Sequence, residues 1–277
     1  MLIGDAKESL DALLPHLIRK ADRRWREDIE RNVEEWWQIV ERQALQDGDP
    51  MNPQRVAHEL SQVLPDDAIV TADSGSSTNW YARQVRLKRG NLASLSGTLA
   101  TMVPGVPYAI AAKFAHPERP VICFVGDGAF QMLGMNEMLT VKRYMDRWVD
   151  KRLIFCVFNN QDLNQVTWEQ RVLEGDPKYP ATQWLPDFDY AKYAELCGLE
   201  GIYCDSGDDM RAAWERALTA GRPVVLEVKT DPEIPPLPPH ITVGQAKKMA
   251  KAMVRDPERT GVLERSFKGK LAEFLRG

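Results

Sequence analysis

The sequence lacks long hydrophobic runs and has little excess of either charge. No apolar stretch approaches the roughly 20 residues that a membrane-spanning helix needs. The 36 basic and 40 acidic residues give a formal net charge of −4, so composition offers no case for nucleic acid as a partner. The first five residues are too few, and turn acidic too soon, for a signal peptide. We therefore expect a cytoplasmic, globular protein.

Cysteine is scarce, and two familiar motifs are missing. The four cysteines form no CxxC pair, and Cys123 and Cys156 lie inside apolar runs, so we expect reduced, buried thiols. No GxGxxG follows a predicted strand anywhere in the chain. This absence argues against a nicotinamide-binding Rossmann domain, the alternative from another functional class.

A strand–helix–strand pattern stands out over residues 121–160. Residues 121–125 and 153–158 are short apolar runs rich in β-branched and aromatic side chains, which is typical of buried strands. A helical stretch from about Phe130 to Trp148 lies between them. Such a unit joins parallel neighbouring strands, whose carboxyl ends meet at the edge where open α/β sheets bind ligands.

Polar residues and glycines follow both strands. Asp127 offers a carboxylate oxygen, Asn160 an amide oxygen and Asp162 a backbone carbonyl, and Mg²⁺ prefers such ligands beside phosphate oxygens and water. Glycines leave room for a phosphate near the backbone N–H groups, and a helix N-terminus attracts it. The candidates that would meet the phosphate are Gly126, Gly128 and Ala129. We predict a magnesium diphosphate site.

These two strand ends resemble the thiamine diphosphate (ThDP) motif, which opens with Gly-Asp-Gly and closes with Asn-Asn. The surrounding stretches, GDGAFQMLGMNEMLTVKRY and NNQDLNQVTWEQR, are similar to the pyruvate oxidase and acetolactate synthase group. The resemblance implies ThDP and Mg²⁺ as cofactors. Asp127 and Asn160 are 33 positions apart, several more than is usual in that group. We place the extra residues in a surface insertion over 144–151.

The resemblance assigns further positions to the cofactor. Gly75, Ser76 and Ser77 follow the predicted strand 68–71 and match diphosphate contacts of the family, although such a turn alone also suits an ordinary helix N-cap. Met102 matches the bulky apolar residue that holds ThDP bent. Methionine is apolar and deformable, which suits that role.

The resemblance also places a substrate pocket beyond Asn160. Glu169 matches a glutamate near the reacting carbon in the pyruvate oxidase branch, and Gln165 and Val166 match residues that line the pocket. Without the resemblance, Glu169 would be interpreted as a solvated helix carboxylate. Residues 171–184 are polar and contain two prolines, so we expect a mobile loop or lid.

Strand and helix patterns alternate over residues 51–232. They predict an α/β parallel-sheet three-layer sandwich, and the resemblance implies the ThDP-binding (pyrophosphate) domain type. Further strands are expected at 201–204 and 224–228, and helices at 51–64, 187–197 and 208–220.

The two ends of the chain are interpreted as separate parts. Residues 1–50 resemble a remnant of the family's middle domain, with a last strand followed by a connector helix over 21–46 that packs on the core. Residues 233–277 contain a proline-rich segment and a helical tail. The basic helix 244–255 places Ala246, Met249, Ala250 and Met253 on one side. We expect it to dock on a neighbouring subunit rather than on a membrane surface.

The resemblance implies an enzyme that decarboxylates a small 2-oxo acid, as a pyruvate oxidase-like oxidoreductase. An acetolactate synthase-type carboligase and a non-catalytic ThDP-binding or regulatory module remain alternatives. The family's activating glutamate has no match here, because the region that would carry it precedes Met1. We therefore expect the isolated chain to be inactive without a homo-oligomer partner or a separate N-terminal half. The use of FAD stays open, since the family's FAD contacts lie largely in the middle domain.

Overall fold

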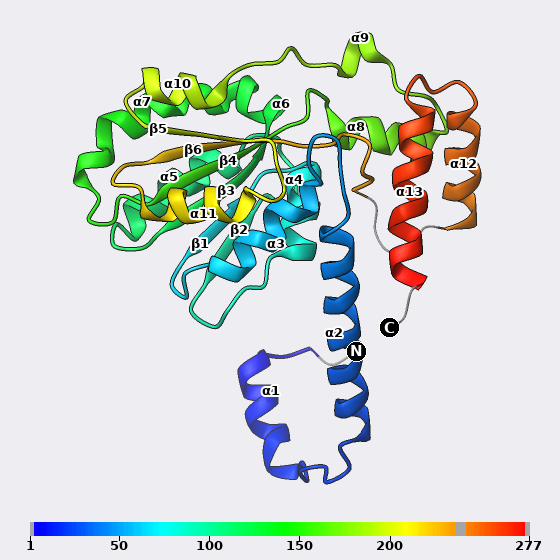
Figure 1. Cartoon of the computed structure of the whole chain (residues 1–277). Coiled ribbons are helices and arrows are strands. Elements are labelled where there is room, and N and C mark those ends of the chain that lie inside the picture. Colours follow the sequence, from blue (N-terminus) through cyan, green and yellow to red (C-terminus); the bar gives the residue numbers. More distant parts are fainter. Residues whose placement is uncertain (1–2, 237–241, 275–277) are drawn as a thin grey trace. The chain divides into compact units, whose positions relative to one another are not determined.

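A parallel sheet dominates the part of the chain that the structure, a computed structural model, describes: residues 3–236 and 242–274. Within those residues the sheet has six strands (Figure 1). Their spatial order is β2 (Leu92–Leu95), β1 (Ile69–Ala72), β3 (Val121–Gly126), β4 (Leu153–Asn159), β6 (Val224–Lys229) and β5 (Glu200–Cys204). Every pairing is parallel, so the predicted parallel α/β sheet is confirmed.

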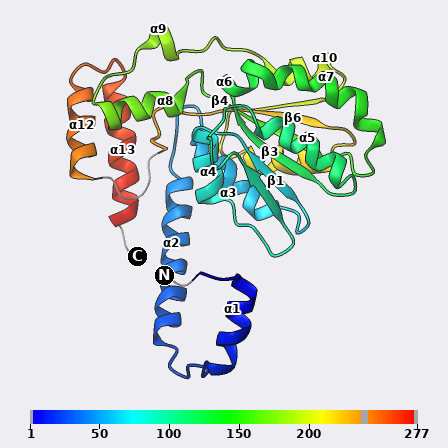
Figure 2. The ribbon, with the colours of Figure 1, turned by 180° about the vertical axis from the view of Figure 1, so that it is seen from behind.

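Helices cover both faces of the sheet and make the predicted three layers (Figures 1 and 2). Successive side chains of a strand point to opposite faces. Accordingly, Ile122 and Phe124 of β3 pack in one core, whereas Cys123 and Val125 pack in the other. The first core includes residues of α3 (Pro53–Val63), α4 (Ser76–Gln84) and α11 (Met210–Thr219), and the second residues of α5 (Gly105–Ala115), α7 (Met135–Tyr144) and α10 (Tyr190–Leu196).

The helix after β3 begins earlier than predicted. It starts at Asp127 as α6 (Asp127–Ala129), continues through a π-helical turn η2 (Phe130–Gly134) into α7, and ends in the 3₁₀ turn η3 (Met145–Arg147). Gly134 permits the π turn, because a Cβ there would lie 2.7 Å from the ring of Phe130. π turns of this kind often occur next to functional sites.

The sheet and one of its connections differ from the prediction at two places. Strand β2 was not predicted; its four residues are all exposed at the edge of the sheet, so no hydrophobic pattern marks it. The proposed surface insertion over 144–151 contains Trp148, which is only 2% exposed and packs edge-on against Phe114 at 5.8 Å between ring centroids. That segment therefore contributes to the core.

The chain forms two compact units, Met1–Ile39 and Val40–Gly277. The first unit holds α1 (Ala6–Leu13), the 3₁₀ turn η1 (Leu14–His16) and most of α2 (Arg24–Ala44), and residues 3–5 do not form the strand implied by the resemblance. On α2, which was expected to pack on the core, the apolar side chains of Trp25, Ile29 and Val33 are exposed, whereas Val40, in the second unit, is buried.

The C-terminal helices α12 (Val243–Met253) and α13 (Arg259–Phe274) follow the sheet. The buried side of α12 agrees with the prediction only in part: Met253 packs with Trp168 and Val172, as does Ala252, whereas Ala246 and Ala250 are exposed. The side expected to meet a neighbouring subunit is thus partly covered by this chain, and docking on a neighbour stays a prediction. Residues 237–240 of the predicted proline-rich segment lie outside the described residues.

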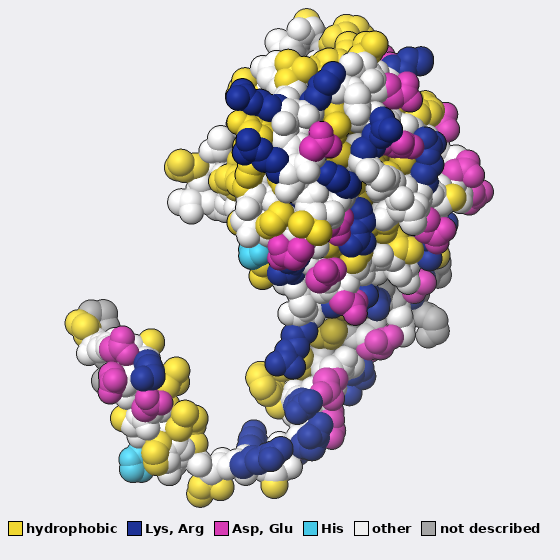
Figure 3. All heavy atoms as spheres, turned by 90° about the vertical axis from the view of Figure 1, so that its left-hand side faces the viewer, with side chains coloured by type: hydrophobic (Ala, Val, Ile, Leu, Met, Phe, Trp, Pro, Cys, Tyr) yellow, Lys and Arg dark blue, Asp and Glu magenta, His cyan; other side chains and the backbone are white. Residues whose placement is uncertain are grey.

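The distribution of charge on the surface and the state of the cysteines agree with what the composition predicts. Basic and acidic side chains are interspersed over the face drawn in Figure 3. All four cysteines are free and buried, as predicted. Within the described ranges, no helix is both long and apolar enough to cross a bilayer.

Candidate functional site

The candidate site lies where the order of the strands reverses. From β1 the chain crosses to β2 on one side, and from β3 it crosses to β4 on the other, so β1 and β3 are neighbours at a switch point. Ligands of open α/β sheets bind in the crevice outside the carboxyl ends of such strands. Residues after β1, β3 and β4 line a cavity of about 520 Å³ at this place.

The structure brings every predicted site residue to the wall of this cavity. The predicted residues on the wall are Gly75, Ser76, Ser77, Met102, Gly126, Asp127, Gly128, Ala129, Asn160, Asp162, Gln165, Val166 and Glu169. They come from four separate stretches of the chain. Their proximity is thus observed, whereas their individual roles stay predictions.

Asp127 is the centre of the geometry. Its Oδ1 accepts the N–H of Gly128 at 2.8 Å, and its Oδ2 accepts the N–H groups of Asn160 at 3.0 Å and Gln161 at 2.7 Å. The end of β3 is thereby bound to the end of β4. Gln161 takes a positive φ of 57°, which is unusual for a residue other than glycine and lets its N–H reach the carboxylate.

The chemistry of this carboxylate fits a cation. Asp127 is 2% exposed, and burial raises its pKa to about 7 even though the three N–H donors act in the opposite direction. A nearby positive charge would favour the ionised form again. No group of three or more His, Cys, Asp or Glu side chains is placed to hold a metal within the described residues. A magnesium site here would accordingly rely on one carboxylate together with amide, carbonyl, phosphate and water oxygens.

Asn160 and Asp162 occupy the loop after β4. The Asn160 Oδ1 accepts the Asp162 N–H at 3.1 Å, which shapes the loop. An isolated antiparallel bridge pairs Asp162 with Trp184. Its two hydrogen bonds run from the Leu163 N–H to the Gln183 carbonyl and from the Leu185 N–H to the Gln161 carbonyl. The side chain of Asp162 is 3% exposed and bonds to Thr167 and Asn164. Because the side chain has these partners, the backbone carbonyl remains the group of Asp162 that we predict to meet the ion.

Two helix N-termini point toward the cavity. The N-cap of α4 is Gly75, with φ 119°, and the N-cap of α6 is Gly126; as glycines they offer no side-chain capping bond. Backbone N–H groups of the first turns can therefore face an anion, apart from that of Gly128, which donates to Asp127. A Cβ on Gly126 would meet nothing within 4 Å. A Cβ on Gly128 would lie 2.7 Å from Leu163, so this glycine permits close packing of the loop rather than the approach of a phosphate.

Met102 lies in a strained turn beside these helices. The next residue, Val103, has a φ of 85°, which is an outlier for a β-branched side chain, and Ala100 also has a positive φ of 48°. Met102 is 37% exposed and lines the cavity. Asp73 is buried under this turn, and burial raises its pKa to about 6 against the N–H groups of Ser74, Val103 and Gly105.

The predicted substrate residues form a hydrogen-bonded row with one residue that the sequence analysis missed. Asn79 of α4 donates to Gln165 at 2.8 Å, and Gln165 donates to Glu169 at 2.9 Å. Gln165 and Glu169 lie on α8 (Asn164–Glu169), one turn apart. Asn79 follows Ser76 by three positions, so helical spacing from the predicted diphosphate turn was the signal for it.

The segment expected to be a mobile polar lid is different in the structure. It forms the π turn η4 (Gln170–Glu174) and the short helix α9 (Pro180–Gln183). Arg171 is fully buried and Lys178 is 6% exposed, because both form ion pairs. A tethered segment, with buried charges at two points, replaces the predicted free loop.

Comparison with known proteins gives the family. A family model described as "Thiamine pyrophosphate enzyme, C-terminal TPP binding domain" matches residues 73–228. YdaP of Bacillus subtilis, whose name assigns it thiamine pyrophosphate provisionally, is 34% identical over 255 residues, 92% of this chain and 43% of that protein.

Further relatives carry more specific names. The mitochondrial acetolactate synthase catalytic subunit of Aspergillus candidus is 30% identical over 86% of this chain and 34% of its own length. The acetolactate synthase isozyme 3 large subunit of Escherichia coli is 29% identical over 78% of this chain and 37% of its own length. The chain thus spans less than half the length of each of these relatives. Since the family model covers more than half of the chain and includes the ends of β3 and β4, this chain belongs to the thiamine pyrophosphate enzymes and contains their C-terminal TPP-binding domain.

Proposed function

We propose that the cavity at the ends of β1, β3 and β4 binds ThDP through Mg²⁺. The observation that carries this proposal is the buried Asp127 carboxylate, whose Oδ2 lies 3.0 Å from the backbone nitrogen of Asn160. Asp127, the Asn160 amide oxygen and the Asp162 carbonyl would hold the ion. The N-termini of α4 and α6 would receive the diphosphate, and Met102 would support the bent cofactor.

We further infer that the chain serves an enzyme that decarboxylates a small 2-oxo acid such as pyruvate. ThDP supplies a carbon nucleophile and an electron sink for that chemistry. The row Asn79, Gln165 and Glu169 holds a carboxylate beside the cavity, where it can orient a substrate and bear a proton near the reacting carbon. Val166, 51% exposed, would add an apolar wall.

Two reactions of the family remain candidates. One is a pyruvate oxidase-like oxidoreductase, which passes electrons to an acceptor and for which FAD is the proposed carrier. The names of two relatives favour an acetolactate synthase-type carboligase. Both need an activating carboxylate toward the aminopyrimidine. We propose that a homo-oligomer partner or a separate N-terminal half supplies it.

Calorimetry tests the binding proposal. ThDP should bind weakly in the presence of Mg²⁺, and this heat should disappear with EDTA or in the Asp127→Ala variant. Binding of equal strength in that variant would contradict the proposal.

Product analysis then separates the two reactions. The chain alone should not consume pyruvate. After addition of a separately expressed N-terminal half of a relative, reduction of an electron acceptor indicates an oxidase, whereas accumulation of acetolactate indicates a carboligase. Binding of ThDP without either product would favour the non-catalytic module.

A further inference from the structure

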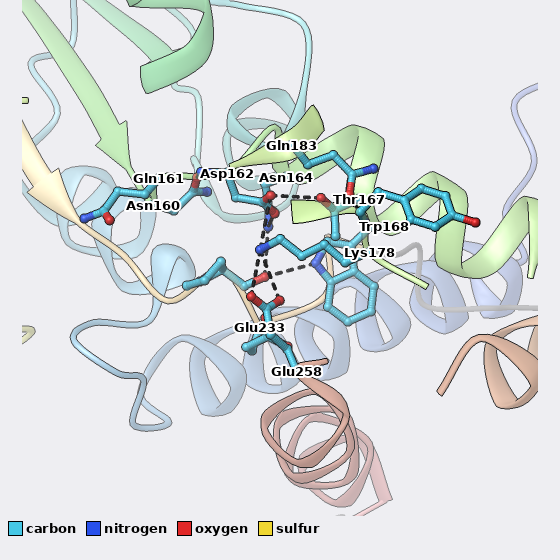
Figure 4. A network of polar contacts seen from close by, with 12 residues as sticks. Asn160, Gln161, Asp162, Asn164, Thr167, Trp168, Lys178, Gln183, Glu233 and Glu258 are labelled. Carbon is cyan, nitrogen blue, oxygen red and sulfur yellow. Dashed lines mark hydrogen bonds and ion pairs between the residues drawn. The ribbon is translucent and has the colours of Figure 1, made fainter. Parts of the chain in front are cut away.

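A buried network of charges joins the loop after β4 to the C-terminal segment. Lys178 lies at its centre, with Nζ 3.3 Å from the Asp162 carboxylate and 2.9 Å from Glu258 (Figure 4). Lys178 precedes α9, Asp162 follows β4, and Glu258 lies between α12 and α13. One ammonium group therefore bridges carboxylates that are far apart in the sequence.

The far side of the network is rigidly held. Arg171 is fully buried, and its guanidinium donates to both oxygens of Asp256 at 2.8 and 2.9 Å and to Glu258 at 3.1 Å. It also lies over the ring of Trp168, 5.0 Å from the centroid. Such a bidentate pair fixes orientation as well as distance. The segment 256–258 is thus an anchored support for Lys178.

The near side of the network is the proposed metal loop. The Asp162 carboxylate, held by Lys178, also accepts the Thr167 hydroxyl at 2.9 Å and the Asn164 amide at 3.3 Å. The residue before it, Gln161, donates its N–H to Asp127. The ion pair with Lys178 and these two hydrogen bonds hold the Asp162 side chain, and so restrain the residue whose backbone carbonyl is a proposed ligand of the ion.

From this geometry we propose that Lys178 is a positioning residue: it transmits the anchorage of segment 256–258 to Asp162 and so holds loop 160–163 in the conformation that binds the metal and diphosphate. This inference rests on the proposed function. The inference extends the proposed function by assigning a role to residues that do not line the cavity. Mutation of a residue that orients a metal ligand from behind commonly lowers the affinity for the metal.

Hydrogen exchange of the ligand-free chain tests the positioning directly. The reporters are the amides of Gln161, Asp162 and Leu163, which donate hydrogen bonds to Asp127, Asn160 and Gln183, respectively. In Lys178→Met, exchange at these amides should rise by at least about tenfold, because breaking a buried ion pair favours local opening. Lys178→Arg, which keeps the charge, should restore most of the protection.

Two further variants separate positioning from general loosening. Glu258→Gln weakens the support of Lys178 and also the 3.1 Å contact from Arg171, while it leaves the ion pair between Lys178 and Asp162 in place. It should give a smaller rise at the same amides, even if Lys178→Met does not fold. Arg265→Met breaks another ion pair of the C-terminal segment, the 2.7 Å contact with Asp231, without touching Asp162. It should leave the three amides protected. An equal rise in Arg265→Met, or no rise in Glu258→Gln, overturns the inference.

Calorimetry adds the link to the cofactor. At saturating Mg²⁺, the Kd for ThDP should rise about tenfold in Lys178→Met and stay unchanged in Arg265→Met. If wild type binds no ThDP, the proposed function fails while the exchange result still decides the positioning. If exchange rises but the Kd does not, the positioning has no consequence for the cofactor and the inference is refuted.

Discussion

The raised pKa of Asp127 leads to a specific pH dependence of metal binding. Burial raises the pKa of this carboxyl to about 7, whereas Mg²⁺ binds the ionised form. About one-tenth of the chains have an ionised Asp127 at pH 6, and about nine-tenths at pH 8, if the site titrates near 7. The apparent affinity scales with the competent fraction, so it should increase about tenfold over this range.

The same shift predicts a stability change of opposite sign without ligand. Folding favours the neutral carboxyl, so its contribution is fully present below 3.8 and is lost as pH rises through about 7. A gap of about three pH units corresponds to about 4 kcal/mol as an upper value. Ligand-free protein should therefore lose unfolding free energy between pH 4 and pH 8, and Mg²⁺ with ThDP should restore part of it.

Calorimetry at several pH values and urea unfolding measure the two effects. Asp127→Asn is the matched control, because its amide does not titrate, whereas the diphosphate and the other groups of the protein, such as Asp73, titrate in both proteins. In the variant, we expect the pH-dependent loss of unfolding free energy that Asp127 causes to disappear. We also expect its metal binding to be weak and nearly independent of pH. Equal Mg²⁺–ThDP affinity of wild type at pH 6 and pH 8, after this correction, would refute the reasoning.

Three substitutions test other parts of the structure. Met102→Ala should lower the unfolding free energy by less than about 1 kcal/mol, because the side chain is 37% exposed, yet weaken ThDP binding in calorimetry. Gly75→Ala should cost about 1–3 kcal/mol in urea unfolding, since φ is 119° although the nearest side-chain atom lies 4.0 Å from the added Cβ. Asp256→Asn should cost about 3–5 kcal/mol by leaving the Arg171 charge buried without its bidentate partner. Lys192→Gln, in a surface pair, should cost under about 1 kcal/mol and serves as its control; equal losses would contradict the estimate.

The part of the fold that could be predicted is the part where burial repeats along the chain. Residues 121–125 and 153–158 are apolar on both faces because helices cover both sides of the sheet, and they were recognised as strands. Strand β2 was missed for the converse reason. Its residues Leu92–Leu95 are exposed at the sheet edge, so only backbone pairing with β1 defines it.

The candidate site was predictable because its residues follow strand ends, and parallel strands bring those ends together. The spacing of residues along the sequence does not reveal which distant side chains form hydrogen bonds or ion pairs in the folded protein. Asn79 and Gln165 are 86 positions apart, and Arg171 and Asp256 are 85 apart. Arg171 and Lys178 therefore looked like polar residues of a loop, and only the folded C-terminal segment reveals their burial.

The two kinds of buried charge in this domain differ in what balances them. Arg171 and Lys178 have carboxylate partners from the same chain, which suits groups whose role is to hold segments together. Asp127 is buried equally well, yet its partners are N–H groups that do not restore its usual pKa. A fold that keeps a carboxylate in this state gives up stability near neutral pH, and a bound divalent ion would return it. The cost falls on the side chain that the strand order places at the switch point of the sheet. That coincidence is the physical reason for placing the ion at Asp127.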